Sequence, residues 1–243
     1  MKDFLQDLID HTIGLDTVDL LKIVGTPAST AITAVADNKT VVLDGSFAKP
    51  IKEFEGTFGM PNLSKLKTIL SFDEYDAESK IEVISETKNN VSQIRSFHFE
   101  TKTGDFINDY RLMNKELVDE KIKSMRYTGT SWQVEIVPTI ASIQRMKKQV
   151  SANSEELNFT TYTSGKDLVF AFGDVSTHSG NFVFASNITG SLARKLKWPI
   201  KTFLTIMDLT GEKNIKIADN GMIKVTVDSG IAVYNYFIPS QSK

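Results

Sequence analysis

The chain of 243 residues contains no cysteine, three histidines and no apolar run long enough to span a bilayer. The lack of cysteine excludes disulfides, thiolate nucleophiles and cysteine-ligated zinc or iron-sulfur sites. The sequence also lacks the charged, apolar and small-residue stretches of a secretory signal. These absences predict a cytoplasmic, globular protein.

Sequence patterns typical of catalysis are equally scarce. His11, His98 and His178 lie far apart, and none has a second histidine or a carboxylate at metal-ligand spacing on a helix. No glycine-rich loop precedes a Lys and Ser/Thr pair, and no Gly-x-Ser-x-Gly turn occurs. We therefore predict a protein that is not an enzyme, with no catalytic residue, metal site or cofactor.

What the chain does have is a long-period repeat. A helical pattern at 3–13 is followed about 58 residues later by a proline-led helix beginning at Met60 and Pro61. A second helical pattern at 139–150 is followed about 60 residues later by another proline-led helix, beginning at Trp198 and Pro199. The arrangement recurs with a period of about 138 residues, which predicts two copies of one module.

Between these helices, alternating apolar and polar residues predict strands. The expected strands cover 19–24, 30–36, 40–47, 54–60, 80–85, 91–101, 132–137, 157–163, 168–175, 182–188, 214–218, 222–227 and 231–238, with turns at 37–38, 88–90, 164–165 and 177–180. Four short helices among so many strands predict an α+β fold of two similar β-rich modules. Module 1 is placed at 1–118, with a connector at about 108–124, and module 2 at 125–243.

The two halves differ in charge. Residues 1–120 carry 13 Lys and Arg against 21 Asp and Glu, whereas residues 121–243 carry 15 against 9. A protein that is acidic overall but has segregated basic segments can bind a polyanion locally and stay soluble. Uneven surface charge without a partner is the alternative interpretation.

Two basic clusters stand out in the second half. One is crowded at the N-terminal end of the Pro199 helix and comprises Arg194, Lys195, Lys197 and Lys201. The other lies opposite the apolar face of the 139–150 helix and comprises Arg145, Lys147 and Lys148. Cations near a helix N-terminus oppose the macrodipole but bind phosphate well, and the lack of interleaved aromatic residues favours contact with a duplex backbone. A solvated basic surface is again the alternative.

The repeat, together with three further features, resembles a DNA sliding clamp, the processivity factor of replicative polymerases. These features are a strand and Pro138 leading into a basic helix, matching lysine-led strands at 80–84 and 213–217, and the ending 234–239. That ending, Tyr-Asn-Tyr-Phe-Ile-Pro, is similar to the Tyr-Tyr-Leu-Ala-Pro terminus of proliferating cell nuclear antigen. The resemblance spans the whole chain and is strongest to the clamps of T-even-type bacteriophages.

The resemblance implies a homotrimeric ring of six modules, with helices lining a hole and sheets forming the rim. Such a ring encircles duplex DNA without sequence preference, through water-mediated phosphate contacts, and is opened by an ATP-driven clamp loader. A phage-encoded clamp would act in the cytoplasm of a bacterial host. The residues expected to face DNA are Arg145, Lys147, Lys148, Arg194, Lys195, Lys197 and Lys201, with Lys65 and Lys67 from the first module.

The resemblance also implies a pocket for the tail peptide of the replicative polymerase. Its expected walls are Tyr236, Phe237, Ile238 and Pro239, together with Leu112 and Met113 from the connector. Without the resemblance, the segment 236–239 is simply a last strand.

Two departures from the clamp pattern concern the first module. It begins directly with its helix, without the strand that opens the nuclear antigen, and that helix is expected to expose Asp7 and Asp10 where clamps offer cations. Two other functions stay open: a β-rich structural protein of a virion, and an enzyme built from scattered carboxylates.

Overall fold

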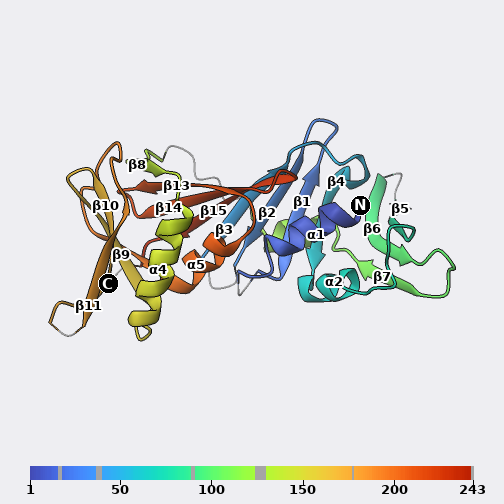
Figure 1. The fold of residues 1–243 in the computed structure, drawn as a ribbon. Helices are drawn as coiled ribbons and strands as arrows, with labels where there is room; N and C mark the ends of the chain where they lie inside the picture. Colours follow the sequence, from blue (N-terminus) through green and yellow to red (C-terminus); the bar gives the residue numbers. More distant parts are fainter. Residues whose placement is uncertain (16–17, 37–39, 89–90, 124–129, 177, 242–243) are drawn as a thin grey trace. The chain divides into compact units, whose positions relative to one another are not determined.

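The computed structural model describes residues 1–243 apart from 16–17, 37–39, 89–90, 124–129, 177 and 242–243. The predicted turn at 37–38, residues 89–90 of the turn at 88–90, and the start of the turn at 177–180 lie outside the described residues. The chain divides into two units: unit 1 is Met1–Met125 with Ser229–Tyr234, and unit 2 is Arg126–Asp228 with Asn235–Lys243. Figure 1 shows the order of the elements along the chain.

The described residues of unit 1 form two sheets and three α-helices. The helices are α1 (Lys2–Asp10), α2 (Leu63–Leu70) and α3 (Lys115–Lys121), and a short 3₁₀-helix covers Lys52–Phe54. One sheet has the order β4-β1-β2-β3, made of β1 (Leu20–Gly25), β2 (Thr30–Val35), β3 (Val42–Phe47) and β4 (Gly56–Pro61). The other has the order β5-β6-β7, made of β5 (Lys80–Lys88), β6 (Val91–Glu100) and β7 (Ile107–Arg111).

Unit 2 contains α4 (Ile140–Ala152) and α5 (Ile200–Asp208). One sheet has the order β11-β10-β9-β12, made of β9 (Asn158–Ser164), β10 (Asp167–Gly173), β11 (Ser179–Ala185) and β12 (Leu196–Pro199). A second series has the order β15-β14-β13-β8, made of β8 (Val134–Ile136), β13 (Glu212–Ala218), β14 (Met222–Asp228) and β15 (Ala232–Pro239). The first three residues of β15 belong to unit 1 and the rest to unit 2.

The topology confirms the predicted duplication and the α+β class. The order β4-β1-β2-β3 in unit 1 is repeated by β12-β9-β10-β11 in unit 2. In the chain, the edge strand β4 is followed by α2, and the edge strand β12 is followed by α5. Pro61 and Pro199 end these edge strands, 138 positions apart, opposite Leu20 and Asn158. An edge strand tolerates proline because its outer side needs no ladder hydrogen bond.

Neither proline occupies the predicted first position of a helix. Helix α2 begins at Leu63, after Asn62 in the left-handed conformation (φ 55°), and Pro199 is the N-cap residue of α5. The predictions also missed β12, so the 182–199 segment holds an additional strand that the turn-like residues concealed.

The segment predicted to connect the modules is structured and belongs to unit 1. Residues 107–111 form β7, and α3 follows, with Asn114 Oδ1 accepting a hydrogen bond from Leu117 N (3.1 Å) at its start. Val118 of α3 is fully buried against β4. The sequence did not indicate β7, whereas the charged stretch 115–123 allows a short helix, and α3 covers most of it.

Gly59 of β4 permits the close approach of α3. A Cβ atom at this position would lie 2.9 Å from Val118 Cγ2 and 3.0 Å from Met113 Cβ. Gly59 N also donates to Met113 O, and Met113 N to Gly59 O, both at 2.8 Å.

Gly59→Val should therefore lower the free energy of unfolding by about 1–3 kcal/mol, because overpacking must displace α3 or break the two backbone bonds. Urea unfolding monitored by circular dichroism measures the change. Thr57→Val, on the same strand two residues earlier and half-buried, should shift the free energy by less than about 0.5 kcal/mol. Equal effects of the two substitutions would contradict the role given to Gly59.

Each unit has its own aromatic core. In unit 1, Phe54, Phe58 and Phe97 contact one another with ring centroids 5.5–6.2 Å apart. In unit 2, Phe159 packs on Phe170 (4.8 Å) and on Phe203 of α5 (5.0 Å). Aromatic burial on this scale stabilises each sheet-helix layer from within its own unit. Across the described residues, no helix is long and apolar enough to cross a membrane.

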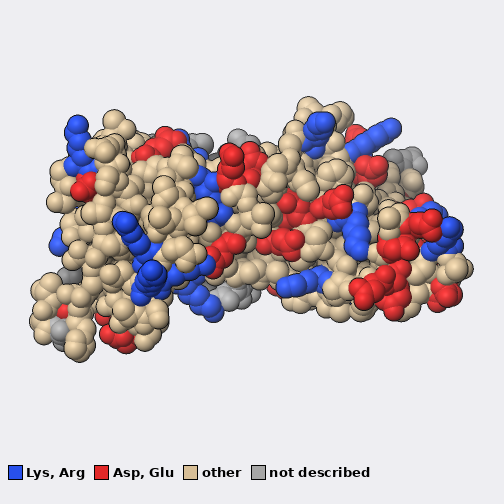
Figure 2. Space-filling model, in the orientation of Figure 1, with Lys and Arg blue, Asp and Glu red and all other residues tan. Residues whose placement is uncertain are grey.

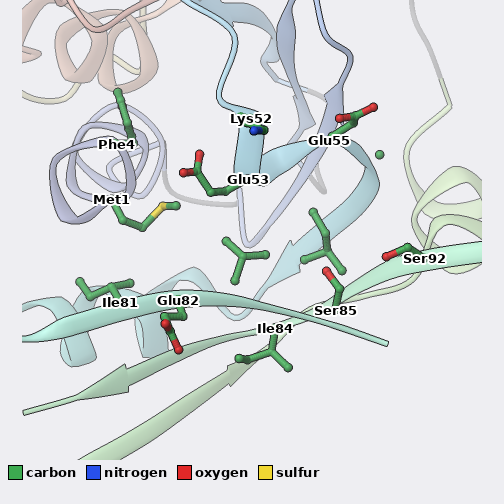
Figure 3. A pocket seen from close by; sticks show the side chains of 13 residues that line it. Met1, Phe4, Lys52, Glu53, Glu55, Ile81, Glu82, Ile84, Ser85 and Ser92 are labelled. Atoms are coloured by element: carbon green, nitrogen blue, oxygen red, sulfur yellow. The ribbon is translucent and has the colours of Figure 1, made fainter. Parts of the chain in front are cut away.

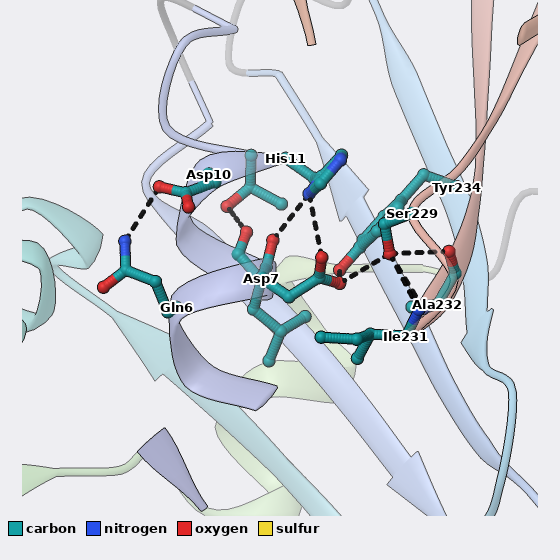
Figure 4. Close-up of polar contacts among 10 residues, drawn as sticks. Gln6, Asp7, Asp10, His11, Ser229, Ile231, Ala232 and Tyr234 are labelled. Atoms are coloured by element: carbon teal, nitrogen blue, oxygen red, sulfur yellow. Dashed lines mark hydrogen bonds and ion pairs between the residues drawn. The ribbon is translucent and has the colours of Figure 1, made fainter. Parts of the chain in front are cut away.

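Helix α1 differs from the prediction in one carboxylate. Asp10 is exposed, as expected, but Asp7 is 8% exposed and points into unit 1. Its Oδ2 accepts hydrogen bonds from Tyr234 Oη (2.6 Å) and Ser229 Oγ (3.1 Å), as Figure 4 shows. The prediction was wrong because the partners lie more than 200 residues away, where helix periodicity gives no information.

Candidate nucleic-acid interface

Helix α4 forms the centre of the candidate interface. Thr139 caps its start in a reciprocal capping box: Ser142 N donates to Thr139 Oγ1, and Thr139 N donates to Ser142 Oγ, both at 3.0 Å. This satisfies two backbone donors and fixes the direction in which the helix leaves Pro138.

Most of the surface of α4 faces solvent. Only Ser142 and Met146 are buried among its 13 residues, whereas the apolar side chains of Ile143 and Val150 are half-buried. Arg145 and Lys148 are exposed and three residues apart, so their side chains share a face. The helix contains no Asp or Glu, and Figure 2 shows blue side chains gathered over α4 and α5.

Uncharged polar residues extend this face. Gln144 and Ser151 are exposed, four residues before and three residues after Lys148, and both side chains can donate hydrogen bonds to phosphate oxygens. The sequence analysis considered only charged residues and therefore missed Gln144 and Ser151. Their spacing of four and three residues from Lys148 is the signal that could have identified them.

Lys147 has an intramolecular partner. Its Nζ lies 2.5 Å from Asp208 Oδ1 at the end of α5, and the two side chains are 39% and 54% exposed. The ion pair joins the two helices of unit 2. Because Asp208 offsets the charge of Lys147, this lysine adds less positive potential to the α4 face than Arg145 or Lys148.

The structure divides the predicted cluster at the Pro199 helix. Trp198 and Phe159 are cross-strand partners on the face of the sheet that packs against Phe203 of α5. Neighbouring strand residues point to opposite faces, so Lys197, opposite Thr160, projects away from α5. Lys195 lies on that same far face, with its Nζ 4.9 Å from the centre of the Tyr162 ring.

The other two members of this cluster are also separated. Arg194 is anchored by its Nε, which donates to Asp219 O (3.1 Å) at the β13-β14 turn. Lys201 is exposed in the first turn of α5. The expectation of four cations at one helix terminus was therefore wrong, because Lys195 and Lys197 lie on the sheet face away from α5 and Arg194 is held at the β13-β14 turn.

The sheet face that points away from α5 also carries a carboxylate, Asp174, near Lys197. The pKa of Asp174 is held below its usual value, first by a backbone hydrogen bond from Ser176 and least by attraction to Lys197. Lys197 thus contributes to a surface that includes a carboxylate, unlike the face of α4.

Unit 1 contributes cations through α2. Lys65 and Lys67 are exposed, and α2 contains no acidic residue. Helix α1, in contrast, exposes Asp3 and Asp10 and has no fully exposed cation. Lys65 and Lys67 are therefore accessible, and their contact with DNA stays a prediction.

The predicted pocket residues are mainly core residues of the chain. Tyr236 and Ile238 are fully buried in β15, and Phe237 is 9% exposed, whereas Pro239 is half-buried. Leu112 and Met113 belong to unit 1, with Leu112 N donating to Arg95 O (2.9 Å). Tyr236 and Ile238 therefore fit the alternative of a last core strand.

Two of the three histidines, His11 and His98, have local side-chain partners. His11 is buried, with Nδ1 2.8 Å from Asp7 O, and His98 Nδ1 lies 2.9 Å from Asp109 Oδ1 across the β6-β7 pair. Within the part of the chain that the structure describes, no group of three or more His, Cys, Asp or Glu residues is arranged to hold a metal ion.

Comparisons with known proteins connect this geometry to one fold. No family model matches the sequence, and no curated protein matches it. Among solved structures, PCNA from A. fulgidus bound to the C-terminal region of FEN-1 matches with a TM-score of 0.72 and 11% identity, covering 100% of this chain and 97% of that one. PCNA from Thermococcus kodakaraensis matches with a TM-score of 0.67 and 12% identity, covering 99% and 97%. The chain therefore has the fold of the PCNA-type sliding clamps.

Proposed function

We propose that the protein is a DNA sliding clamp of the T-even bacteriophage type, a non-enzymatic processivity factor that encircles duplex DNA and tethers the replicative polymerase. The observation that carries the proposal is the repeated strand order of the two units within a clamp fold. The proposal places the protein in the cytoplasm of a bacterial host.

In this proposal, exposed cations on the helices contact the DNA backbone. The face of α4 supplies Arg145 and Lys148, α5 supplies Lys201, and α2 supplies Lys65 and Lys67. Contacts of this kind recognise phosphate rather than base sequence, so the ring can slide. Lys195 and Lys197 are left out, because they project from the opposite face of the α5-bearing sheet.

Open strand edges support ring closure. In unit 1, β7 ends the order β5-β6-β7, and in unit 2, β11 ends the order β11-β10-β9-β12. Unpaired edges of two different sheets can pair between copies in a head-to-tail contact, which forms a ring if the rotation closes. Three copies give the six modules of the proposed homotrimer, and an ATP-driven loader opens it.

The polymerase tail is proposed to bind at the C-terminal segment. Of the residues expected there, Pro239 and Met113 keep partly accessible side chains, whereas Tyr236 and Ile238 would support the site from the core.

Native mass spectrometry combined with negative-stain electron microscopy tests the assembly. We expect a mass three times that of the 27.1 kDa chain and a ring whose hole is about the width of a duplex. A second measurement tests encirclement: after loading, the ring should stay on a nicked circular plasmid and slide off once the plasmid is cut. A monomer at all concentrations, or equal retention on circular and linear DNA, would contradict the proposal.

A further inference from the structure

A groove of about 940 Å³ lies beside β5, the strand of unit 1 whose outer edge no described residue pairs, as Figure 3 shows. The charged groups that line it, or that pair with its lining, are Glu53, Glu55, Glu82, Lys52, Lys80 and the Met1 ammonium group. Negative and positive groups are equal in number, so the groove selects neither an anion nor a cation. The turn between β13 and β14 in unit 2 has a more specific chemistry.

This turn contains Asp-Asn-Gly at 219–221, the one place in the chain where glycine follows asparagine. Asn220 is exposed, and its side chain has no hydrogen-bond partner among the described residues. Its amide group can therefore turn toward the backbone nitrogen of Gly221. Glycine has no Cβ atom, so no side chain hinders that approach.

The fold requires glycine at position 221. The φ of Gly221 is 88°, in the left-handed region that other residues rarely adopt, and a Cβ atom there would lie 2.4 Å from Ser240 Oγ. A residue with a side chain, which would shield Asn220, is therefore disfavoured by the backbone and by the packing of the C-terminal segment.

We propose that Asn220 is a site of spontaneous deamidation, with water as the only co-reactant. The backbone nitrogen of Gly221 loses its proton and attacks Cγ of Asn220. A new C–N bond forms while the Cγ–Nδ2 bond breaks, and the amide nitrogen takes up a proton and leaves as ammonia. Water then opens the resulting succinimide ring at either carbonyl carbon, which gives aspartate or isoaspartate at position 220. Nucleophile and electrophile are adjacent in the chain, so no further group has to bring them together.

The turn has to open before the nitrogen can react. Gly221 N donates a hydrogen bond to Ala218 O at 3.0 Å, and this bond must break first. Exposed hairpin ends open locally at a low cost in free energy. The folded protein should therefore deamidate more slowly than an unfolded chain, but at Asn220 before its other asparagines.

The same turn joins other segments of unit 2. Asp219 N donates to Gln133 Oε1 (2.7 Å), and oxygens of Asp219 accept from Ala193 N (2.9 Å) and Arg194 Nε (3.1 Å). A change in the main chain at position 220 therefore acts on contacts that hold several parts of the unit.

The contact most directly affected holds the C-terminal segment. Ser240 N donates to Gly221 O (2.7 Å), and Gln241 N donates to Lys197 O (2.9 Å). In isoaspartate the main chain runs through Cγ, which adds one carbon atom to the backbone just before Gly221. Gly221 O is then displaced from Ser240 N, so isoaspartate at position 220 should release the segment that begins at Ser240.

Peptide mapping of the incubated protein tests the reaction. Deamidation replaces an amide by a carboxylate and raises the mass by one dalton, and trypsin releases residues 217–224 with Asn220 as their only asparagine. We expect a rate at least about tenfold higher at Asn220 than at Asn187, which is also exposed but precedes the β-branched Ile188. An unincubated sample gives the baseline. No mass change at Asn220, or equal rates at the two asparagines, would overturn the proposal.

Amide hydrogen exchange tests the release of the C-terminal segment. Deamidation adds a negative charge, so ion exchange separates the deamidated fraction, in which exchange at Ser240 should be at least about tenfold faster. Freshly purified Asn220→Asp adds the charge without the additional backbone atom and should stay within about twofold of the unmodified protein. Asn220→Gln should show no change on incubation, and thermal unfolding verifies that both variants fold. Unchanged exchange in the deamidated fraction, or equally fast exchange in Asn220→Asp, would show that isoaspartate does not release the segment.

Discussion

Replacing Asp7 with alanine should lower the free energy of unfolding by about 3 kcal/mol, because it removes the carboxylate acceptor of a buried hydrogen-bond network. The Asp7 side chain is 8% exposed and accepts from Tyr234 Oη at 2.6 Å and from Ser229 Oγ at 3.1 Å. His11 Nδ1 lies 3.4 Å from Asp7 Oδ1, and its ring stacks on Tyr234 with centroids 4.6 Å apart. Urea unfolding at a fixed protein concentration measures the loss.

A double-mutant cycle tests whether the effect comes from the network. Tyr234→Phe removes only the hydroxyl and should cost about 1–2 kcal/mol, with a coupling to Asp7→Ala of about 1 kcal/mol or more. Asp10→Ala is the matched control, since Asp10 is exposed three residues along the same helix and hydrogen-bonds only to Gln6 among the contacts shown in Figure 4. It should cost less than about 0.5 kcal/mol. Additive losses from Asp7→Ala and Tyr234→Phe would show that the two groups are not coupled.

This network has a structural consequence for unit 1. Ser229 and Tyr234 lie in the segment 229–234, which the chain reaches only after completing most of unit 2. Ala48 N also donates to Ile231 O (2.9 Å), so both α1 and the end of β3 hold this segment. Unit 1 therefore depends on residues from the C-terminal end of the chain, and a truncation at 228 should destabilise it.

Reversing the charges of α4 should impair the proposed clamp function without unfolding the protein. Arg145→Glu with Lys148→Glu replaces two exposed cations by two anions in each subunit. In the proposed trimer, the same change occurs on the inner surface of all three subunits. We expect processive primer extension by the cognate polymerase to fall at least about tenfold, because phosphate contacts dominate non-specific DNA affinity. A plot of the logarithm of the DNA-binding constant against the logarithm of the salt concentration should become less steep. Its slope should change by about 0.9 for each phosphate contact that the substitutions remove.

The control for this prediction has the same charge change on the same unit. Lys195→Glu with Lys197→Glu reverses two cations on the sheet face that points away from α5. Primer extension and the salt slope should stay within about twofold of the unchanged protein. Native mass spectrometry tests whether both double variants still form the proposed trimer. If the Lys195 and Lys197 variant loses as much activity as the α4 variant, the assignment of the DNA face is wrong.

Some parts of the fold could be predicted because they depend on local patterns. Most strands, though not β7 or β12, and the helices at 2–10 and 140–152 follow from apolar periodicity, and the cap at Thr139 follows from its side-chain chemistry. The repeat was visible because proline recurs at the same structural position, the end of an edge strand at Pro61 and Pro199. The helix that each proline was expected to begin starts slightly later, because pairing with β1 and β9 continues through the proline.

The candidate interface was predicted in composition but only partly in arrangement. Arg145 and Lys148 share a helix face because residues three apart always do, so their grouping required no tertiary information. The ion pair between Lys147 and Asp208 involves two helices about 60 residues apart, and sequence spacing cannot indicate it. Lys195 and Lys197 were grouped with Lys201 because the intervening strand β12 was not recognised.

The sequence by itself determined the duplicated α+β architecture, the absence of cysteine chemistry and the concentration of exposed cations on α4. These depend on composition and on periodicity within single elements, which short-range sterics and amphipathic packing dictate. Only the tertiary structure decided that Asp7 is buried, that Lys195 and Lys197 point away from α5, and that β5 has an open edge where β13 has β8. The burial of a side chain, the sheet face to which it points and the pairing of a strand edge all depend on residues distant in the chain. They are therefore decided only when the sheets assemble.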